Sequence, residues 1–252
     1  MKTLMRQIRV AVTPRRWPLR TRLANGAVVY GRNRPGFGGR GIYVFRDAIE
    51  PEFQHLEEFL GPSGVFVDVG ASSGIYTLKA AKHYSKSDGV VLAIEPFIDV
   101  LADLFHSIES NDFTNIRLRN CCASDRTGSA KLWRNFRKPN QFSLVRRDEE
   151  ASFLQVMTVA IDDLLVWESL ERLDYLKIDA EGAEARILRG ARRTIERLRP
   201  IIQMETTYMD DATIDLGDYS GFHAPSSVNT VYMPNEHPKI LLPARLGWAQ
   251  VS

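Results

Sequence analysis

Cysteine is scarce in this sequence: there are two among 252 residues, Cys121 and Cys122, and they are adjacent. Adjacent cysteines rarely form a disulfide with each other, and they lack the spacing of metal ligands. The sequence therefore argues against a disulfide framework and against a zinc site. We expect both thiols to be reduced and buried in a strand.

Long apolar runs are absent as well, since no stretch approaches the roughly 20 apolar residues of a membrane-spanning helix. The net charge of +2 is too small for a dedicated nucleic-acid binder. With 44% hydrophobic and 25% charged residues, the chain can bury one substantial core. We expect a soluble, cytoplasmic protein with one α/β domain over residues 47–252, preceded by an extension over residues 1–46.

Acidic residues are missing from residues 1–46, where the basic ones are Lys2, Arg6, Arg9, Arg15, Arg16, Arg20, Arg22, Arg32, Arg34, Arg40 and Arg46. Pro14 and Pro18 interrupt any helix there, and the segment lacks the apolar run of an export signal. One interpretation is a partly flexible, solvated arm with a pair of strands around residues 26–30 and 41–45, because charge runs are usually solvated faces. The other is a patch that contacts anionic lipid at the inner face of the membrane, or an acidic, lipid-linked substrate.

Residues 65–76, VFVDVGASSGIY, form the stretch around which the chain is organised, and they read as a strand, a turn of small residues and the start of a helix. This stretch has neither the G-x-G-x-x-G of dinucleotide folds nor the phosphate-binding G-x-x-x-x-G-K-[ST]. A ligand can approach its backbone closely because Gly70 and Gly74 have no Cβ atom. Asp68, two residues before Gly70, would repel a phosphate and attract a cation or an amino group. The alternative is an ordinary βα turn.

Acidic residues also follow the next two predicted strands. Glu95 ends the apolar run VVLAIE, and an acid at the tip of the second strand is where a doubly wound sheet holds a ribose diol. Charge-assisted hydrogen bonds of this kind contribute ~1.5 to 3 kcal/mol each. Asp125 follows a strand expected over residues 116–123. It either accepts a hydrogen bond from the amine of an adenine or caps its own backbone.

A second dense cluster, LDYLKIDAEGAEARILRG, occupies residues 173–190. Lys177 lies in a predicted buried strand, Asp179 ends that strand, and Glu181 lies in the turn that follows. Carboxylates this close raise one another's pKa unless a cation compensates, and such a cluster suits proton removal or metal binding. For Glu184 the alternative is a structural role at the start of the next helix.

Four motifs, DVGASSGIYT, AIEPF, ASDRTG and LKIDAEGAEARILRGA, together resemble the FkbM family of S-adenosylmethionine-dependent O-methyltransferases. The resemblance runs from about Phe53 to the C-terminus and leaves the basic arm outside. Family members commonly have Asn or His where this sequence has Ser72. The resemblance implies an α/β fold, a doubly wound, seven-stranded, mostly parallel sheet with helices on both faces.

The resemblance also implies that S-adenosylmethionine is the cofactor. The residues expected to bind it are Asp68, Gly70, Ala71, Ser73, Gly74, Glu95, Pro96, Ser124 and Asp125. Asp179 or Glu181 is expected to remove the proton of an acceptor hydroxyl, with Lys177 neutralising the cluster or orienting the acceptor. A divalent cation, Mg²⁺ or Mn²⁺, held by these carboxylates is an alternative that lowers the pKa of the acceptor.

The expected acceptor is a sugar hydroxyl in a glycan, a glycolipid or a secondary metabolite, as the resemblance implies. The alternatives are a non-sugar small molecule, or an inactive protein of the same fold that binds a partner through its basic arm. The Asn/Asp-Pro-Pro-aromatic signature of amino methylases does not occur at the fourth strand. Glu205 and His223 are further candidates for the site, and the polar residues 135–150 are expected to form a loop over it.

Overall fold

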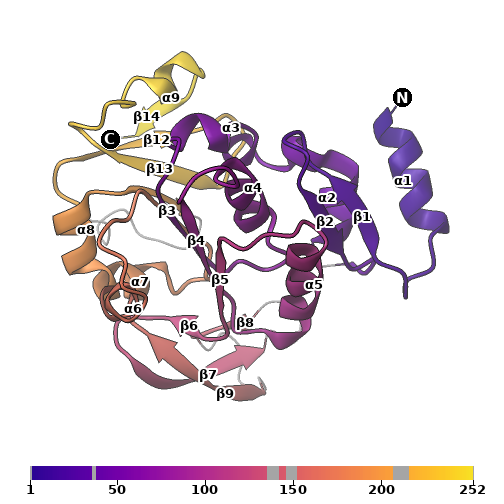
Figure 1. Ribbon diagram of the computed structural model, residues 1–252, viewed down its shortest axis with the longest axis horizontal. Helices are drawn as coiled ribbons and strands as arrows, with labels where there is room; N and C mark the ends of the chain where they lie inside the picture. The colour runs from indigo at the N-terminus through magenta and orange to yellow at the C-terminus, as the bar shows by residue number, and fades with distance from the viewer. Residues whose placement is uncertain (1, 36–37, 135–141, 146–151, 207–215, 252) are drawn as a thin grey trace.

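The computed structural model describes residues 2–35, 38–134, 142–145, 152–206 and 216–251. Within these residues the centre of the molecule is an eight-stranded sheet in the order β14-β12-β13-β11-β10-β3-β4-β5 (Figure 1). Neighbours from β5 to β11 pair in parallel, and neighbours from β11 to β14 pair antiparallel. The strands are β3 (Val65–Val69), β4 (Val90–Ile94), β5 (Ile116–Arg119), β10 (Tyr175–Ile178), β11 (Ile201–Glu205), β12 (Tyr219–His223), β13 (Asn229–Pro234) and β14 (Ala249–Val251).

Helices cover both faces of this sheet, which confirms the doubly wound α/β fold. The apolar residues of β3 alternate between two cores: Phe66 packs on one face, and Val65 and Val67 pack on the other. The first face is covered by α3 (Pro51–Phe59), α4 (Ile75–His83) and α5 (Ile98–Glu109). The second is covered by α6 (Ile161–Trp167), α7 (Glu184–Gly190) and α8 (Arg192–Leu198). Burial on both faces explains why β3 and β10 are apolar apart from one charged residue each, Asp68 and Lys177.

The sheet has one strand more than expected, because β14 adds to the edge formed by β12. The sequence predicts a turn at Gly221 and Phe222, but the structure places both inside β12. A Cβ atom on Gly221 would lie 2.5 Å from the side chain of Val251. The glycine is therefore needed for the close packing of β14 rather than for a turn.

A second sheet, in the order β6-β9-β7-β8, lies beside the carboxyl ends of the central strands (Figure 1). Its strands are β6 (Cys122–Ala123), β7 (Gly128–Arg134), β8 (Phe142–Ser143) and β9 (Phe153–Val159). The single strand expected over residues 116–123 is thus split between β5 and β6. The break lies at Asn120, whose side-chain amide donates to the carbonyls of Glu95 (3.0 Å) and Pro96 (2.9 Å).

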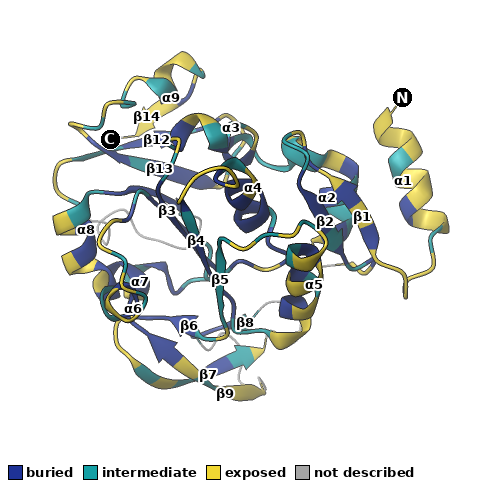
Figure 2. Ribbon diagram, in the orientation of Figure 1, coloured by how far each residue is buried: buried dark blue, intermediate teal, exposed yellow. Residues whose placement is uncertain are grey.

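The basic segment at the N-terminus contains more regular structure than the sequence predicts. It forms α1 (Lys2–Val12), a hairpin of β1 (Leu19–Arg22) and β2 (Val28–Gly31), α2 (Gly39–Phe45) and a 3₁₀ turn (Arg46–Ile49). The pairing expected between residues 26–30 and 41–45 is wrong, because β2 pairs with β1 and residues 41–45 lie in α2. Pro14 ends α1 rather than preventing it, since the helix stops at Val12. Figure 2 shows that α1 is largely exposed, whereas the central strands are buried.

The last described helix is α9 (Leu242–Arg245), which lies next to β14. Among the residues that the structure describes, every helix is too short or too polar to cross a membrane.

Candidate active site

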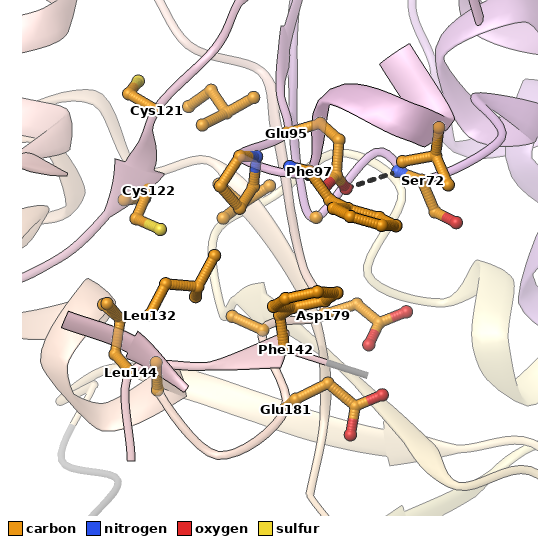
Figure 3. A pocket seen from close by; sticks show the side chains of 18 residues that line it. Ser72, Glu95, Phe97, Cys121, Cys122, Leu132, Phe142, Leu144, Asp179 and Glu181 are labelled. Carbon is orange, nitrogen blue, oxygen red and sulfur yellow. Dashed lines mark hydrogen bonds between the residues drawn. The ribbon is translucent and has the colours of Figure 1, made fainter. Parts of the chain in front are cut away.

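A cavity of about 230 Å³ opens at the carboxyl ends of β3, β4 and β10, the edge where open α/β sheets bind ligands. The second sheet forms its opposite wall (Figure 3). Polar and acidic groups line one part of the cavity, and apolar side chains line the other. The lining residues are Val69, Gly70, Ser72, Ile94, Glu95, Pro96, Phe97, Val100, Cys121, Cys122, Ala123, Leu132, Phe142, Leu144, Asp179, Ala180, Glu181 and Ala183.

The small-residue turn after β3 contributes Gly70 and Ser72 to this lining. Gly70 has a φ of +73°, and a Cβ atom there would lie 1.9 Å from the carbonyl oxygen of Asp179. The glycine therefore lets the ends of β3 and β10 meet at the cavity. Gly74 has φ +76° and packs against Leu104 instead. Ala71, Ser73 and Gly74 do not line the cavity.

Glu95 lies at the tip of β4 with both carboxylate oxygens held by backbone groups. The N–H of Ser72 donates to Oε2 (2.9 Å), and the N–H of Phe97 donates to Oε1 (2.8 Å). Burial raises the pKa of Glu95 to about 7, although these two hydrogen bonds lower it. Each oxygen of a carboxylate has a second lone pair, so the group can still accept hydrogen bonds from a ligand in the cavity.

Asp68 is buried behind the turn and does not line the cavity. Its Oδ2 accepts hydrogen bonds from the N–H (3.1 Å) and the hydroxyl (2.6 Å) of Thr77 in the first turn of α4. Its Oδ1 lies 3.6 Å from Nζ of Lys177. The structure therefore places Asp68 where it fixes the start of α4 and pairs with Lys177, one layer behind the cavity.

Lys177 links Asp68 to the acidic residues that face the cavity. Its Nζ lies 3.3 Å from Oδ2 of Asp179 and 3.5 Å from the carbonyl oxygen of Gly70. Burial lowers the pKa of Lys177, but the carboxylates of Asp179, Asp68 and Glu50 outweigh it and raise the pKa above its ordinary value. Lys177 is therefore a cation at neutral pH, and it is not itself a base.

Asp179 and Glu181 line the cavity together, and Figure 3 shows their carboxylates pointing to the same side of it. Glu181 adopts a φ of +52° in the turn after β10, and Ser143 of the second sheet donates a hydrogen bond to its carbonyl oxygen (2.8 Å). Glu184 has a different position: it is buried, and its Oε1 accepts from the N–H groups of Ala180 (3.0 Å) and Gly182 (3.1 Å). Glu184 therefore holds the turn in shape, which is the structural alternative considered for it.

The other five candidates differ in whether they line the cavity. Pro96 lines the cavity, whereas Ser124, Asp125 and His223 do not. The hydroxyl of Ser124 donates to Oδ1 of Asp125 (3.0 Å), and the side chain of Asp125 is exposed. Glu205 is also outside the lining. Of the expected loop over residues 135–150, residues 135–141 and 146–150 lie outside the described part of the chain.

Both cysteines line the cavity, Cys122 from β6 and Cys121 just before it. They are free thiols. Burial raises the pKa of Cys121 to about 11 and that of Cys122 to about 12. Both are therefore protonated at neutral pH. Cys122 is buried in a strand, as the sequence predicts, and Cys121 is half-buried.

The sequence gives no signal for the apolar part of the cavity. The rings of Phe97, after β4, and Phe142, in β8, lie with their centroids 4.4 Å apart and their planes at 32°. Leu132 in β7 and Leu144, directly after β8, also belong to the lining. Phe142 is separated from Phe97 by 44 intervening residues in the sequence, and only the folded second sheet brings the two rings together.

A buried hydrogen-bond network behind Lys177 was also not predicted. The hydroxyl of Tyr76 donates to Oε2 of Glu50 (2.6 Å) and accepts from the amide of Gln203 (2.8 Å), and the hydroxyl of Tyr175 donates to Gln203 (2.8 Å). Nζ of Lys177 lies 5.1 Å from the centre of the Tyr76 ring. Burial raises the pKa of Glu50. These residues are far apart in the sequence, so no motif or regular spacing could have predicted that they lie together.

Within the described residues, no three side chains of histidine, cysteine, aspartate or glutamate are arranged so that they could hold a metal ion. The acidic residues at the cavity are Glu95, Asp179 and Glu181. In this part of the chain, the divalent cation considered from the sequence therefore lacks a group of three such side chains.

Three comparisons with known proteins find relatives of this chain in sequence and in fold. A model of the "Methyltransferase FkbM domain" matches residues 68–223, which is more than half of the chain. "Methyltransferase 1" of Beauveria bassiana (strain ARSEF 2860) is 26% identical over 170 residues, which cover 56% of this chain and 68% of that protein. The crystal structure of methyltransferase FkbM from Methylobacillus flagellatus KT superposes with a TM-score of 0.50 at 19% identity, covering 92% of this chain. This chain spans 58% of the length of that structure.

Proposed function

The chain belongs to the FkbM methyltransferase family, and on this premise we propose that it transfers a methyl group from S-adenosylmethionine to a hydroxyl of a sugar in a glycan, a glycolipid or a secondary metabolite. One observation carries the proposal. The carboxylate of Glu95, held by two backbone N–H groups, lines the same cavity as Asp179 and Glu181. The cavity is therefore lined both by Glu95, which can accept hydrogen bonds from hydroxyls, and by the negatively charged side chains of Asp179 and Glu181.

The lining fits the chemical groups of this cofactor. The free lone pairs of Glu95 suit the two hydroxyls of a ribose, as expected for an acid at the tip of the second strand. The rings of Phe97 and Phe142 offer apolar faces against which a flat heterocycle can pack. Asp179 and Glu181 supply negative charge that attracts a cationic group. When bound, the cofactor supplies a methyl group on a positively charged sulfur.

The chain's own contribution is to position the acceptor and to move its proton. Asp179 or Glu181 accepts the hydrogen bond of the acceptor hydroxyl and removes its proton during the attack, a role that contributes about 10²- to 10⁴-fold in rate. Lys177 pairs with Asp179 through the 3.3 Å contact and fixes the direction of its carboxylate. Alignment of the reacting atoms supplies ~7 to 11 kcal/mol in well-oriented systems.

Calorimetric titration with S-adenosylhomocysteine and S-adenosylmethionine tests the cofactor. We expect binding to the unmodified protein and a loss of about tenfold or more in Glu95→Ala, because each charge-assisted hydrogen bond contributes ~1.5 to 3 kcal/mol. The matched control is Glu109→Ala, since Glu109 is exposed at the end of α5. A folded protein that binds neither compound would refute the proposal.

Methyl transfer to a panel of sugar and non-sugar hydroxyls tests the acceptor. At a cofactor concentration that saturates each variant, Asp179→Asn or Glu181→Gln should lose about 10²- to 10⁴-fold in turnover. Transfer to the non-sugar compounds alone would contradict the sugar assignment. Cofactor binding without transfer to any hydroxyl would favour an inactive binding protein.

A further inference from the structure

Helix α1 is fixed on the body of the protein in one orientation. Val10 is buried in a small cluster with Val44. The guanidinium of Arg6 donates to the carbonyl oxygen of Val44 (2.9 Å). The amide of Asn33 donates to the carbonyl oxygens of Val10 (3.2 Å) and Thr13 (2.8 Å) at the end of the helix. The basic segment therefore presents a preformed helix with a defined outer face.

The outer face of α1 is apolar, which reverses the usual arrangement of a surface helix. Successive helical residues are rotated by about 100°, so Ile8 lies about 160° from Val10, on the side away from the body. Its neighbours on this face are Leu4, Met5 and Val12. The exposed fractions are 60% for Leu4, 65% for Met5, 55% for Ile8 and 73% for Val12. Figure 2 shows this exposure at the edge of the molecule.

Basic side chains border this apolar face. Lys2 and Arg9 are exposed on α1, and Arg15, Arg16 and Arg20 are exposed directly after it. No acidic residue occurs before Asp47. Trp17 is also exposed, and tryptophan is enriched where membranes meet water because its ring is apolar and its N–H is polar.

We propose that α1 lies flat on the surface of an anionic lipid bilayer, with Leu4, Met5, Ile8 and Val12 inserted between the headgroups and Trp17 at the interface. The charge favours this occupant over a second copy of the chain, because a second copy would bring two sets of basic residues together. An apolar face with lysine and arginine beside it is the pattern of helices that bind in the plane of a membrane. The proposal concerns attachment alone and does not depend on the proposed function.

Sedimentation with lipid vesicles tests this attachment in the full-length chain. We expect binding to phosphatidylcholine vesicles that contain about one quarter phosphatidylserine, weakened by about 0.5 M NaCl. Ile8→Glu should weaken binding at least tenfold, because it removes apolar surface and adds a negative charge. The matched control is Gln7→Glu, which adds the same charge beside the apolar face and removes no apolar residue. It should weaken binding about fivefold, the effect of one charge at ~1 kcal/mol.

Circular dichroism and thermal unfolding should show that both variants remain folded, because both positions are exposed. Equal binding by Ile8→Glu and Gln7→Glu would overturn the insertion of the apolar face. Equal binding to vesicles of phosphatidylcholine alone would overturn the anionic partner. Absence of vesicle binding would overturn the proposal outright, as would a dimer in solution that Ile8→Glu dissociates, since that dimer would bury the same face.

Discussion

Glu95 is the residue on which the candidate site depends most. Its two hydrogen bonds from Ser72 and Phe97 tie the turn after β3 to the chain that leaves β4. These bonds fix the position of the carboxylate, while burial makes the charged form costly and raises its pKa to about 7. The protonation state of this one group therefore changes within the pH range in which the protein would work.

The titration of Glu95 predicts a pH dependence of cofactor binding. With a pKa of about 7, roughly a tenth of the group is ionised at about pH 6 and most of it at about pH 8. A carboxylate accepts hydrogen bonds from two hydroxyls better than a carboxylic acid, so affinity for S-adenosylhomocysteine should rise up to about tenfold over this interval. Titration calorimetry at several pH values between about 6 and 8 measures this affinity. The same rise in Glu95→Gln, which cannot ionise, would contradict the prediction.

The stability of the folded protein should change with pH in the opposite direction to its affinity for the cofactor, because the pKa of Glu95 is raised on folding. A group whose pKa is raised on folding stabilises the folded state below its ordinary pKa, here 4.5, and loses that contribution as the pH rises through its folded value. Ionised Glu95 is thus a cost to the free protein at neutral and higher pH. The residue proposed to recognise the ligand is therefore one whose ionised form destabilises the folded protein.

At the scale of elements, the sequence predicts best the strands that are buried on both faces. The buried strand predicted around Lys177, with Asp179 at its end, is confirmed as β10, because Lys177 is the only polar residue in the apolar run. The turn after β3 and the start of α4 were likewise predictable from Gly70 and Gly74. Glu95, Asp179 and Glu181, expected at strand ends, all line the cavity, since the carboxyl ends of parallel strands meet at one edge.

Short strands and residues that meet only through tertiary packing were not predictable. Strand β6 has two residues, and β12 contains Gly221, which reads as a turn until its packing against Val251 is known. Helix α2 includes a glycine-rich start that resembles a loop. Glu50 precedes Pro51 and reads as the start of a helix. Its contact with Tyr76 arises only when α3 and α4 pack together.

Because the ends of β3 and β10 lie so close together, we expect a methyl group added at Gly70 to destabilise the folded protein. Gly70→Ala would place a Cβ atom 1.9 Å from the carbonyl oxygen of Asp179, in a backbone conformation with φ +73°. Overpacking and the positive φ together should lower the free energy of unfolding by about 2 to 5 kcal/mol. Urea unfolding measures this.

The matched control for Gly70 is Gly247→Ala. Gly247 has a φ of +76°, and among the described residues only its own chain neighbours can lie within 4 Å of its Cβ position. This variant isolates the conformational cost, about 1 to 2 kcal/mol. Equal losses in the two variants would show that contact with Asp179 adds nothing.

At the scale of the whole molecule, most of the N-terminal segment is part of the body. The N–H of Val28 donates to Asn111 (2.8 Å) and the N–H of Tyr30 donates to Ser107 (2.9 Å), so the hairpin is bound to α5. Arg32 pairs with Asp103 of the same helix (2.8 Å). The hairpin and α2 also contribute Leu23, Ala27, Val29 and Ile42 to the main core.

This packing predicts that two truncations of the segment will differ. Removal of residues 1–13 takes away α1, in which only Val10 is buried, and should leave the unfolding temperature within a few degrees of its value. Removal of residues 1–46 exposes the core under the hairpin and should lower the unfolding temperature by more than about 10 °C or prevent folding. Scanning calorimetry of the two truncated proteins and of the unmodified one measures these unfolding temperatures. Equal stability of the longer truncation would mean that residues 14–46 are dispensable.

The two thiols in the cavity wall confine the labelling of cysteine to one place in the protein. Cys121 and Cys122 are the only cysteines in the chain, and both line the space that the cofactor is proposed to fill. Since their pKa values are raised to about 11 and about 12, thiol-directed reagents should react slowly with them. A reagent that does react attaches to the wall of the cavity, so a change in its rate of reaction on addition of S-adenosylhomocysteine would report whether that space is occupied.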